Sequence, residues 1–303
     1  MEYILETKDL EKRYKNFKAL NHTNIHIEKG AIYGLVGKNG AGKTTLIRII
    51  CGLQKPTSGS YIIYGKSSNE NIESVRKRIG AIIESPSIYG EMSARDNLIE
   101  QYKLVGMPNY DSIDELLELV GLNNTGKKRA KNFSLGMKQR LGIALALANN
   151  PDFLILDEPI NGLDPQGIIE IRELILKLNK EKRITILISS HYLDELSKIA
   201  THYGFLDNGS IIKEISSDEL MKKMQHKIQL KVSNQKEFIK YFEENGISYE
   251  VVDSKIINVY GNYNLSKFIN NLSKKNLVAD EIHEQEESIE NYYINLIGGA
   301  KDD

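Results

Sequence analysis

Cysteine is almost absent from this sequence, since Cys51 is the single one among 303 residues. One thiol cannot form a disulfide within the chain, so a disulfide-stapled fold is excluded and a reducing compartment such as the cytoplasm is expected. Long apolar runs are missing too. The densest, LGIALALA at 141–148, is far shorter than the roughly 20 residues of a membrane-spanning helix. We therefore expect that the chain crosses no membrane by itself.

A strong charge of either sign is also missing. The formal net charge is −1, so there is no overall bias towards nucleic acid or an anionic membrane, and no nucleic-acid partner is expected. The opening MEYILETKDLEKRYK is charged and has no apolar core, so we expect no secretion signal. With 41% hydrophobic and 27% charged residues, the chain can bury a core and stay soluble. Its length suits roughly two domains.

The first 220 residues have the pattern of an α/β domain. Apolar strand-like runs alternate with longer helical patterns, which predicts a largely parallel sheet covered on both faces. These runs are AIYGLVG, RIGAIIES, PDFLILDE and RITILISS. The stretch from about 88 to 150 is mostly helical, because its apolar residues recur at spacings of three and four. We interpret it as a helical subdomain inserted into the domain 1–220.

The character of the sequence changes after residue 220. KIQLKV alternates apolar and polar residues, and SYEVVDSKIINVYG is typical of two short strands around a turn. Three further segments are predicted helices: QKEFIKYFEENG, LSKFINNLSKKN and ESIENYYINLIGG, the last one stopped by Gly298 and Gly299. Residues 221–303 are therefore predicted to form a small accessory α+β domain.

The stretch GKNGAGKTT at 37–45 fits the pattern G-x-x-x-x-G-K-[ST] between an apolar strand and a helical run. Its glycines let backbone amides turn inward, and these amides and the helix N-terminus form an anion site. Lys43 can reach terminal phosphates, and the Thr44 hydroxyl can bind Mg²⁺. A glycine-rich turn that only caps a helix is the competing interpretation. The predicted binding residues are Gly37, Asn39, Gly40, Ala41, Gly42, Lys43, Thr44 and Thr45.

Two adjacent acids end the apolar run PDFLILDEP at 151–159. Asp157 is predicted to hold Mg²⁺ and Glu158 to orient or deprotonate the attacking water, as phosphoryl transfer from a bound triphosphate requires. Simple termination of a strand by acids is the competing interpretation, and the phosphate-loop pattern disfavours it.

The stretch FSLGMKQRLGIALALANNPDFLILDEPINGLDP resembles the nucleotide-binding domain of ATP-binding cassette (ABC) transporters. The family signature Leu-Ser-Gly-Gly-Gln aligns with Phe133 to Met137, where three positions depart and Ser134 and Gly136 remain. The resemblance implies that the signature contacts an ATP held by a second chain, and hence a head-to-tail dimer. Ser134 also has the sequence position of a helix N-cap.

Three further motifs resemble parts of that family. Tyr14 in LEKRYKNFKAL resembles the aromatic residue that stacks on adenine, with Phe17 as the alternative and an exposed strand tyrosine as the plainer interpretation. Asp164 in NGLD resembles the key acid of the loop that links the two ATP sites. His191, after ILISS, resembles the switch histidine that contacts the γ-phosphate. The resemblance implies that Lys43, Glu158, Asp164 and His191 carry catalysis.

Glu84 stands where most members of the family have a glutamine that helps to bind Mg²⁺ and begins the loop towards the membrane partner. A carboxylate is a harder ligand than an amide, and it adds negative charge beside a triphosphate unless a metal bridges them. We expect Glu84 to be a metal ligand, and a solvated loop acid is the plainer interpretation. A glutamate at this position, the signature SLGM and the ending ESIENYYINLIGG together make the sequence resemble one branch of the family. That branch serves bacitracin resistance, lantibiotic immunity and related peptide export.

The resemblance implies an ABC-type P-loop NTPase core, with a RecA-like parallel sheet, an antiparallel β subdomain, the helical insert and the C-terminal α+β domain. It implies an ATPase that uses ATP and Mg²⁺, works with a second ATP-binding subunit and powers a separate permease at the cytoplasmic face of the membrane. Another cargo, or a peptide-sensing complex, is the alternative. A soluble ABC ATPase acting on ribosomes or DNA is disfavoured, because the chain has one cassette and no long coiled coil.

Overall fold

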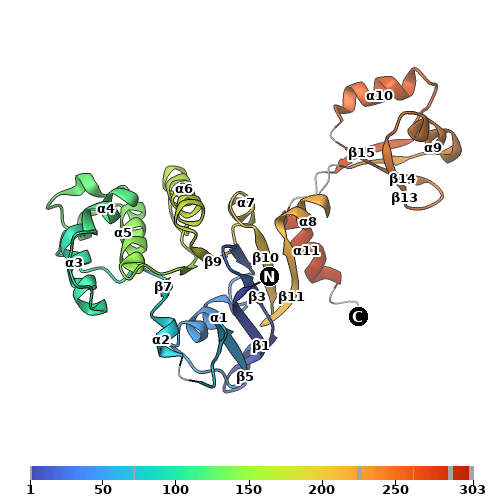
Figure 1. The fold of residues 1–303 in the computed structure, drawn as a ribbon. Helices are drawn as coiled ribbons and strands as arrows, with labels where there is room; N and C mark the ends of the chain where they lie inside the picture. Colours follow the sequence, from blue (N-terminus) through green and yellow to red (C-terminus); the bar gives the residue numbers. More distant parts are fainter. Residues whose placement is uncertain (1, 71, 224–226, 262, 286–288, 300–303) are drawn as a thin grey trace. The chain divides into compact units, whose positions relative to one another are not determined.

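The computed structural model describes residues 2–70, 72–223, 227–261, 263–285 and 289–299. The chain divides into two compact units, Met1–Ser217 and Asp218–Asp303. Figure 1 shows the elements of both. Within the described residues, no helix is both long and apolar enough to span a bilayer.

A six-stranded sheet forms the centre of the first unit, in the order β11-β10-β4-β9-β8-β7. The five strands from β10 to β7 run parallel, and β11 pairs antiparallel with β10. Strands β4, β8 and β9 are buried along their whole length, as expected of a parallel sheet covered on both faces. The predicted largely parallel sheet is confirmed. The bounds are β4 Ile32–Val36, β7 Ile79–Ile82, β8 Phe153–Asp157, β9 Thr185–Ser190, β10 His202–Asp207 and β11 Ser210–Ser216.

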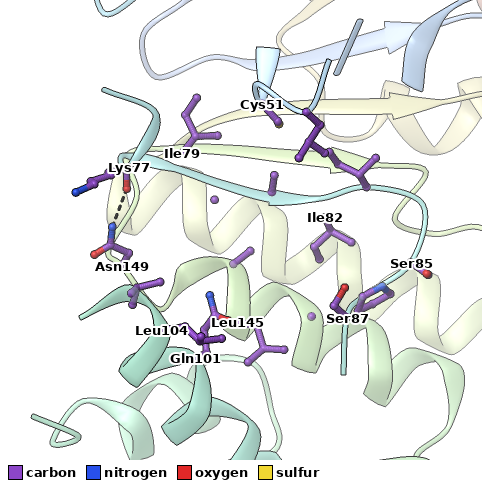
Figure 2. A pocket seen from close by; sticks show the side chains of 18 residues that line it. Cys51, Lys77, Ile79, Ile82, Ser85, Ser87, Gln101, Leu104, Leu145 and Asn149 are labelled. Atoms are coloured by element: carbon purple, nitrogen blue, oxygen red, sulfur yellow. Dashed lines mark hydrogen bonds between the residues drawn. The ribbon is translucent and has the colours of Figure 1, made fainter. Parts of the chain in front are cut away.

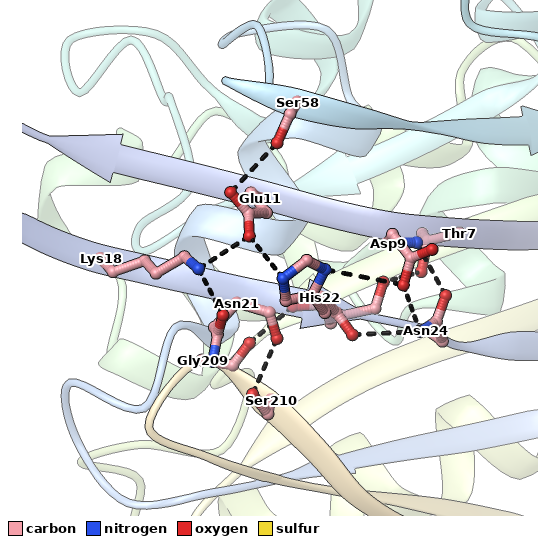
Figure 3. Close-up of polar contacts among 11 residues, drawn as sticks. Thr7, Asp9, Glu11, Lys18, Asn21, His22, Asn24, Ser58, Gly209 and Ser210 are labelled. Carbon is pink, nitrogen blue, oxygen red and sulfur yellow. Dashed lines mark hydrogen bonds and ion pairs between the residues drawn. The ribbon is translucent and has the colours of Figure 1, made fainter.

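An antiparallel sheet in the order β2-β1-β5-β6, with β3 paired to β1, lies at the start of the chain. Its strands are β1 Tyr3–Tyr14, β2 Phe17–Thr23, β3 His26–Glu28, β5 Ser58–Ile63 and β6 Lys66–Ser67. Figure 3 shows how β2 is tied to the turn between β10 and β11. The Asn21 amide donates to the Gly209 carbonyl at 2.8 Å, and the Ser210 hydroxyl donates to the Asn21 carbonyl at 2.7 Å. These bonds fix β2 beside the turn between β10 and β11, and the Gly209 amide of that turn donates to the Ala41 carbonyl in the loop that follows β4.

The helices of the first unit fall into two groups. Four accompany the two sheets: α1 Lys43–Ile50, α2 Glu73–Arg76, α6 Pro165–Lys182 and α7 Leu193–Ser197. The others come from the predicted helical insert and gather together in green in Figure 1: α3 Ala94–Val105, α4 Ile113–Leu119, the 3₁₀ turns η1 Asn123–Thr125 and η2 Ala130–Asn132, and α5 Leu135–Leu147. Helix α3 begins with a capping box, in which Ser93 and Asp96 satisfy each other's backbone amides.

The second unit contains a four-stranded antiparallel sheet in the order β13-β14-β12-β15. Its chain order is β-α-β-β-α-β, which with this strand order is the ferredoxin-like arrangement. The elements are β12 Lys227–Lys231, α9 Gln235–Glu244, β13 Ser248–Val251, β14 Ile256–Tyr260, α10 Leu265–Ser273 and β15 Glu281–Gln285. Helix α8 Ser217–Lys223 precedes them and α11 Ile289–Gly299 follows. The core of this sheet includes Ile228, Leu230, Phe238, Phe242, Ile257, Val259, Phe268 and Leu272.

Two features of this unit differ from the sequence-based expectations. Strand β15 was not expected, and it completes the sheet by pairing with β12. The last helix was expected to be stopped by Gly298 and Gly299, but both glycines are helical in α11, which the structure describes as far as Gly299. The first two residues of the segment expected to form that helix, 287 and 288, lie outside the described residues.

Candidate functional site

The loop between β4 and α1 has a backbone path that two of its glycines make possible. Gly42 has a φ of +113°, and a Cβ there would lie 2.5 Å from the Ala19 carbonyl oxygen of β2. A Cβ at Gly37 would lie 2.6 Å from the Leu206 carbonyl oxygen. Neither position can hold a larger residue without moving backbone. The loop is therefore pressed between β2 and β10 with the free amides of α1 at its end, as an anion site requires.

The remaining residues of the predicted phosphate loop form its tip and the start of α1. Asn39 and Gly40 are exposed, and Gly40 has a φ of +83°. Ala41 is buried, and its carbonyl accepts from the Gly209 amide at 2.9 Å. Thr45 is half-buried within α1. The tip is thus open to solvent while both of its ends are anchored.

Lys43 is 5% exposed and turns its ammonium group back into the protein. Its Nζ donates to the Gly37 carbonyl at 2.5 Å and to the Lys38 carbonyl at 3.2 Å. The same Nζ lies 3.2 Å from Glu158 Oε1. Three protein oxygens thus surround the ammonium that the sequence predicts to bind terminal phosphate oxygens.

Glu158 is held in an unusual backbone conformation directly after β8, with a φ of +51°. Its amide donates to Ser189 Oγ at 3.0 Å, which anchors this turn to β9. Glu158 Oε2 lies 2.8 Å from His191 Nδ1, and Oε1 is buried and accepts no hydrogen bond. The Tyr192 ring packs on the His191 ring, with centroids 4.1 Å apart. Glu158 therefore contacts Lys43 through one carboxylate oxygen and His191 through the other, so the three side chains form one connected row.

Thr44 and Asp157 meet beside this row although 113 positions separate them. The Thr44 hydroxyl donates to Asp157 Oδ2 at 2.8 Å, and the Ser189 hydroxyl donates to Asp157 Oδ1 at 2.5 Å. Asp157 is 1% exposed. A hydroxyl and a carboxylate at the mouth of a phosphate loop are oxygen ligands of the kind that Mg²⁺ takes together with substrate phosphates and water. These residues fit a magnesium site.

The apolar run RIGAIIES was expected to form a strand through Glu84, but the strand is shorter than the run. Strand β7 ends at Ile82, and Glu84 follows in a left-handed conformation with a φ of +64°. Its side chain is 62% exposed, and Glu84 Oε1 accepts from Arg48 Nη2 at 2.6 Å. Sequence reasoning missed Arg48, although it stands four residues after Thr44 in the same helix.

Tyr14 and Phe17 face each other across the turn between β1 and β2, where they are a registered pair. Tyr14 is 39% exposed and Phe17 is 61% exposed. The Tyr14 hydroxyl donates to Gln54, and Lys12 Nζ lies 5.3 Å from the centre of the Tyr14 ring. Both aromatic rings are accessible, so each remains a candidate for stacking on adenine.

Ser134 and Asp164 both cap helices, and the structure brings these helix starts together. Ser134 Oγ accepts from the Met137 amide at 3.2 Å at the start of α5. Asp164 Oδ1 accepts from the Gly167 amide at 2.9 Å at the start of α6. A Cβ at Gly136 would lie 3.8 Å from Gly167 Cα. Figure 1 shows α5 with the helical insert, apart from α1 and the phosphate loop.

Comparison with known proteins places this site in context. The chain matches the ABC transporter family over residues 20–161. It is 44% identical over 303 residues to the bacitracin transport ATP-binding protein BcrA of Bacillus licheniformis, covering 99% of both chains. It is 46% identical over 216 residues to the lantibiotic transport ATP-binding protein SrtF of Streptococcus pyogenes, covering 71% of this chain and 92% of that one. The dimeric, post-hydrolysis structure of the ATP-binding cassette MJ0796 bound to ADP and Pi has a TM-score of 0.61 at 26% identity, covering 70% of this chain and 98% of that one.

Proposed function

The chain belongs to the ABC transporter family, and from this membership we propose that it is the ATP-hydrolysing subunit that powers export of a peptide antibiotic through a separate permease. As an ABC ATPase it binds and hydrolyses ATP. The proposal that the cargo is a peptide antibiotic rests on the full-length similarity to the ATP-binding protein of a bacitracin transporter. The similarity to the lantibiotic transport protein supports the same class of cargo.

In the proposed mechanism, the phosphate loop and the N-terminus of α1 hold the triphosphate of ATP, and Tyr14 or Phe17 stacks on its adenine. Lys43 turns from its carbonyl partners and Glu158 to the terminal phosphate oxygens. Glu158 then accepts a proton from the attacking water on its buried Oε1, which pairs with the Lys43 ammonium in the structure and is released when Lys43 turns. His191 keeps Glu158 oriented through the 2.8 Å contact and supports the γ-phosphate.

Thr44 and Asp157 would hold the magnesium ion, and we propose Glu84 as a further ligand on the same side. Magnesium bound there would neutralise the charge that develops on the phosphate oxygens. Asp157 suits this role because Ser189 already orients one carboxylate oxygen, which leaves the other to share with Thr44.

We propose that two ATP-binding chains pack head to tail, so that Ser134 and Gly136 of one face the nucleotide of the other. The capped start of α5 supports this, because its free amides can meet an anion. Leu135, which stands at a departure from the family signature, is 51% exposed beside that cap. Its Cδ2 would lie 3.3 Å from a Cβ at Gly162, so the signature touches the loop that leads to Asp164. A conformational change at one can therefore reach the other.

The permease is proposed to dock in a groove of about 760 Å³ beside β7. Figure 2 shows its lining, which comes from the turn after α1, from β7 and its following loop, and from α3 and α5. Leu53 and Leu104 are 66% and 72% exposed there, which offers apolar surface to a partner. The groove includes Gln101 of α3 and Ser85, which follows Glu84 in the loop that the family resemblance directs towards the membrane partner. Docking there would hold the chain at the cytoplasmic face of the membrane.

The test is protection of a sensitive Gram-positive host that expresses this chain with its permease. We expect the wild-type chain to protect against one class among bacitracin, lantibiotics and amphipathic cytolytic peptides. Glu158→Gln should abolish protection, because the base is lost. Glu173→Gln, on an exposed position of α6, is the matched control and should protect fully. No protection against any peptide, with an assembled complex that hydrolyses ATP, would refute the proposed cargo.

A further inference from the structure

The ion pair between Arg48 and Glu84 joins the helix that follows the phosphate loop to the loop that follows β7. Arg48 Nη2 lies 2.6 Å from Glu84 Oε1 across 36 positions of sequence. Both side chains reach solvent, with exposed fractions of 35% and 62%. Glu84 nevertheless keeps the left-handed backbone that side-chain-bearing residues rarely adopt. The surrounding loop therefore fixes the backbone position from which the Glu84 side chain extends.

Arg48 ties that carboxylate to the helix that carries Thr44 of the candidate magnesium site. Thr44 and Arg48 are four residues apart in α1, so they project from the same face of the helix, about one 5.4 Å turn from each other. Thr44 carries the hydroxyl that bonds Asp157, and Arg48 carries the guanidinium that bonds Glu84. One helix face thus presents a metal ligand and, one turn further on, the counter-ion of a second candidate ligand.

We propose that Arg48 is a positioning residue that keeps Glu84 off the metal position until Mg²⁺ and ATP are bound, when Glu84 exchanges Arg48 for the metal. This inference rests on the metal role given to Glu84 in the proposed function. Glu84 has a cationic partner both before and after the exchange, so its charge is compensated in both states. An ion pair so exposed to water is weak, and a divalent cation bound beside a triphosphate can therefore take the carboxylate from it. If the ion pair only held α1 and the loop together, its loss would leave magnesium binding unaffected.

The exchange is measurable as the Mg²⁺ concentration that half-saturates binding of a fluorescent ATP analogue. The full chain with Glu158→Gln serves as the background, so that binding is read without hydrolysis. Arg48→Gln should lower the half-saturating concentration by roughly two- to fivefold, the range expected for loss of an exposed ion pair. Arg48→Lys keeps the charge and should stay close to the parent. Thermal melts of each variant establish that it is folded.

Glu84→Gln separates the possible failures. If it leaves the half-saturating Mg²⁺ concentration unchanged, the metal role of Glu84 in the proposed function is wrong. If it changes that concentration while Arg48→Gln does not, the exchange is overturned and the metal role stands. In a chain that already carries Glu84→Gln, adding Arg48→Gln should not change the half-saturating Mg²⁺ concentration further. An equal effect with and without Glu84 would show that Arg48 acts only as a nearby positive charge, which also overturns the proposal.

Discussion

Phe242 is the residue through which the independence of the C-terminal unit can be tested. It is fully buried, and its ring centre lies 5.6 Å from that of Tyr249, 5.9 Å from that of Tyr241 and 6.1 Å from that of Phe238. Phe242→Ala removes this packing and leaves a cavity, which costs about 3–5 kcal/mol. That is a large share of the ~5–15 kcal/mol that stabilises a small domain. The unfolded fraction of this unit should rise by roughly two to four powers of ten.

Urea denaturation of the full chain, followed by circular dichroism, is the assay. We expect two transitions, because the structure has two compact units, each with its own core. Phe242→Ala should move only one of them to lower urea, and ATP with Mg²⁺ should move only the other to higher urea, since ligand stabilises the unit that binds it. Lys236→Ala, exposed in the same helix, is the control and should change stability by less than about 0.5 kcal/mol.

A single transition that shifts as a whole in Phe242→Ala would refute this reasoning, because the two units would then unfold as one. The ATPase rate of the same variant distinguishes two roles for residues 221–303. Retained turnover at a temperature where this unit is unfolded indicates an appendage that completes the fold. Lost turnover indicates that the unit regulates hydrolysis or stabilises the dimer.

Two more predictions concern the groove beside β7. Leu104→Glu should abolish co-purification with the permease, because it puts a charge on the apolar surface of the groove. Leu176, which is 40% exposed on α6, provides the control, and Leu176→Glu should leave co-purification intact. Co-purification of the Leu104→Glu variant would contradict the docking site. Burial raises the pKa of the Cys51 thiol from 9.0 to about 12. Since the thiolate is the reactive form, labelling by a disulfide reagent at pH 8 should be about a thousandfold slower in the folded chain than in urea. The labelling rate of the folded chain should rise about tenfold per pH unit up to pH 10. Equal rates in the two states would contradict the burial of this thiol.

The strand, loop and helix that carry the proposed phosphate loop could be predicted from sequence because their determinants are local. A buried strand, glycines at fixed offsets and a following helix all lie within residues 32–50, and Gly37 and Gly42 each have a steric reason. The largely parallel sheet was predictable for a similar reason, since continuous apolar runs mark strands that are covered on both faces.

The features that the sequence did not reveal depend on distant partners. Strand β15 has one apolar residue, Ile282, so its extended form comes from pairing with β12 rather than from its own pattern. The contact of Arg48 with Glu84 joins two exposed side chains, for which hydrophobic periodicity gives no signal. The backbone of Glu84 was unexpected as well, because nothing local indicates a left-handed residue after β7.

Lys43 and Glu158 neutralise each other where solvent hardly reaches, since their side chains are 6% and 17% exposed. A substitution of Lys43 by an uncharged residue therefore removes the proposed phosphate contact and, at the same time, leaves a buried carboxylate without its cation. The loss of ATP binding in such a variant mixes these two effects. Pairing Lys43→Met with Glu158→Gln would separate them, because the amide needs no counter-charge. Any inactive form of this chain chosen for structural work is thus better made at Glu158 than at Lys43.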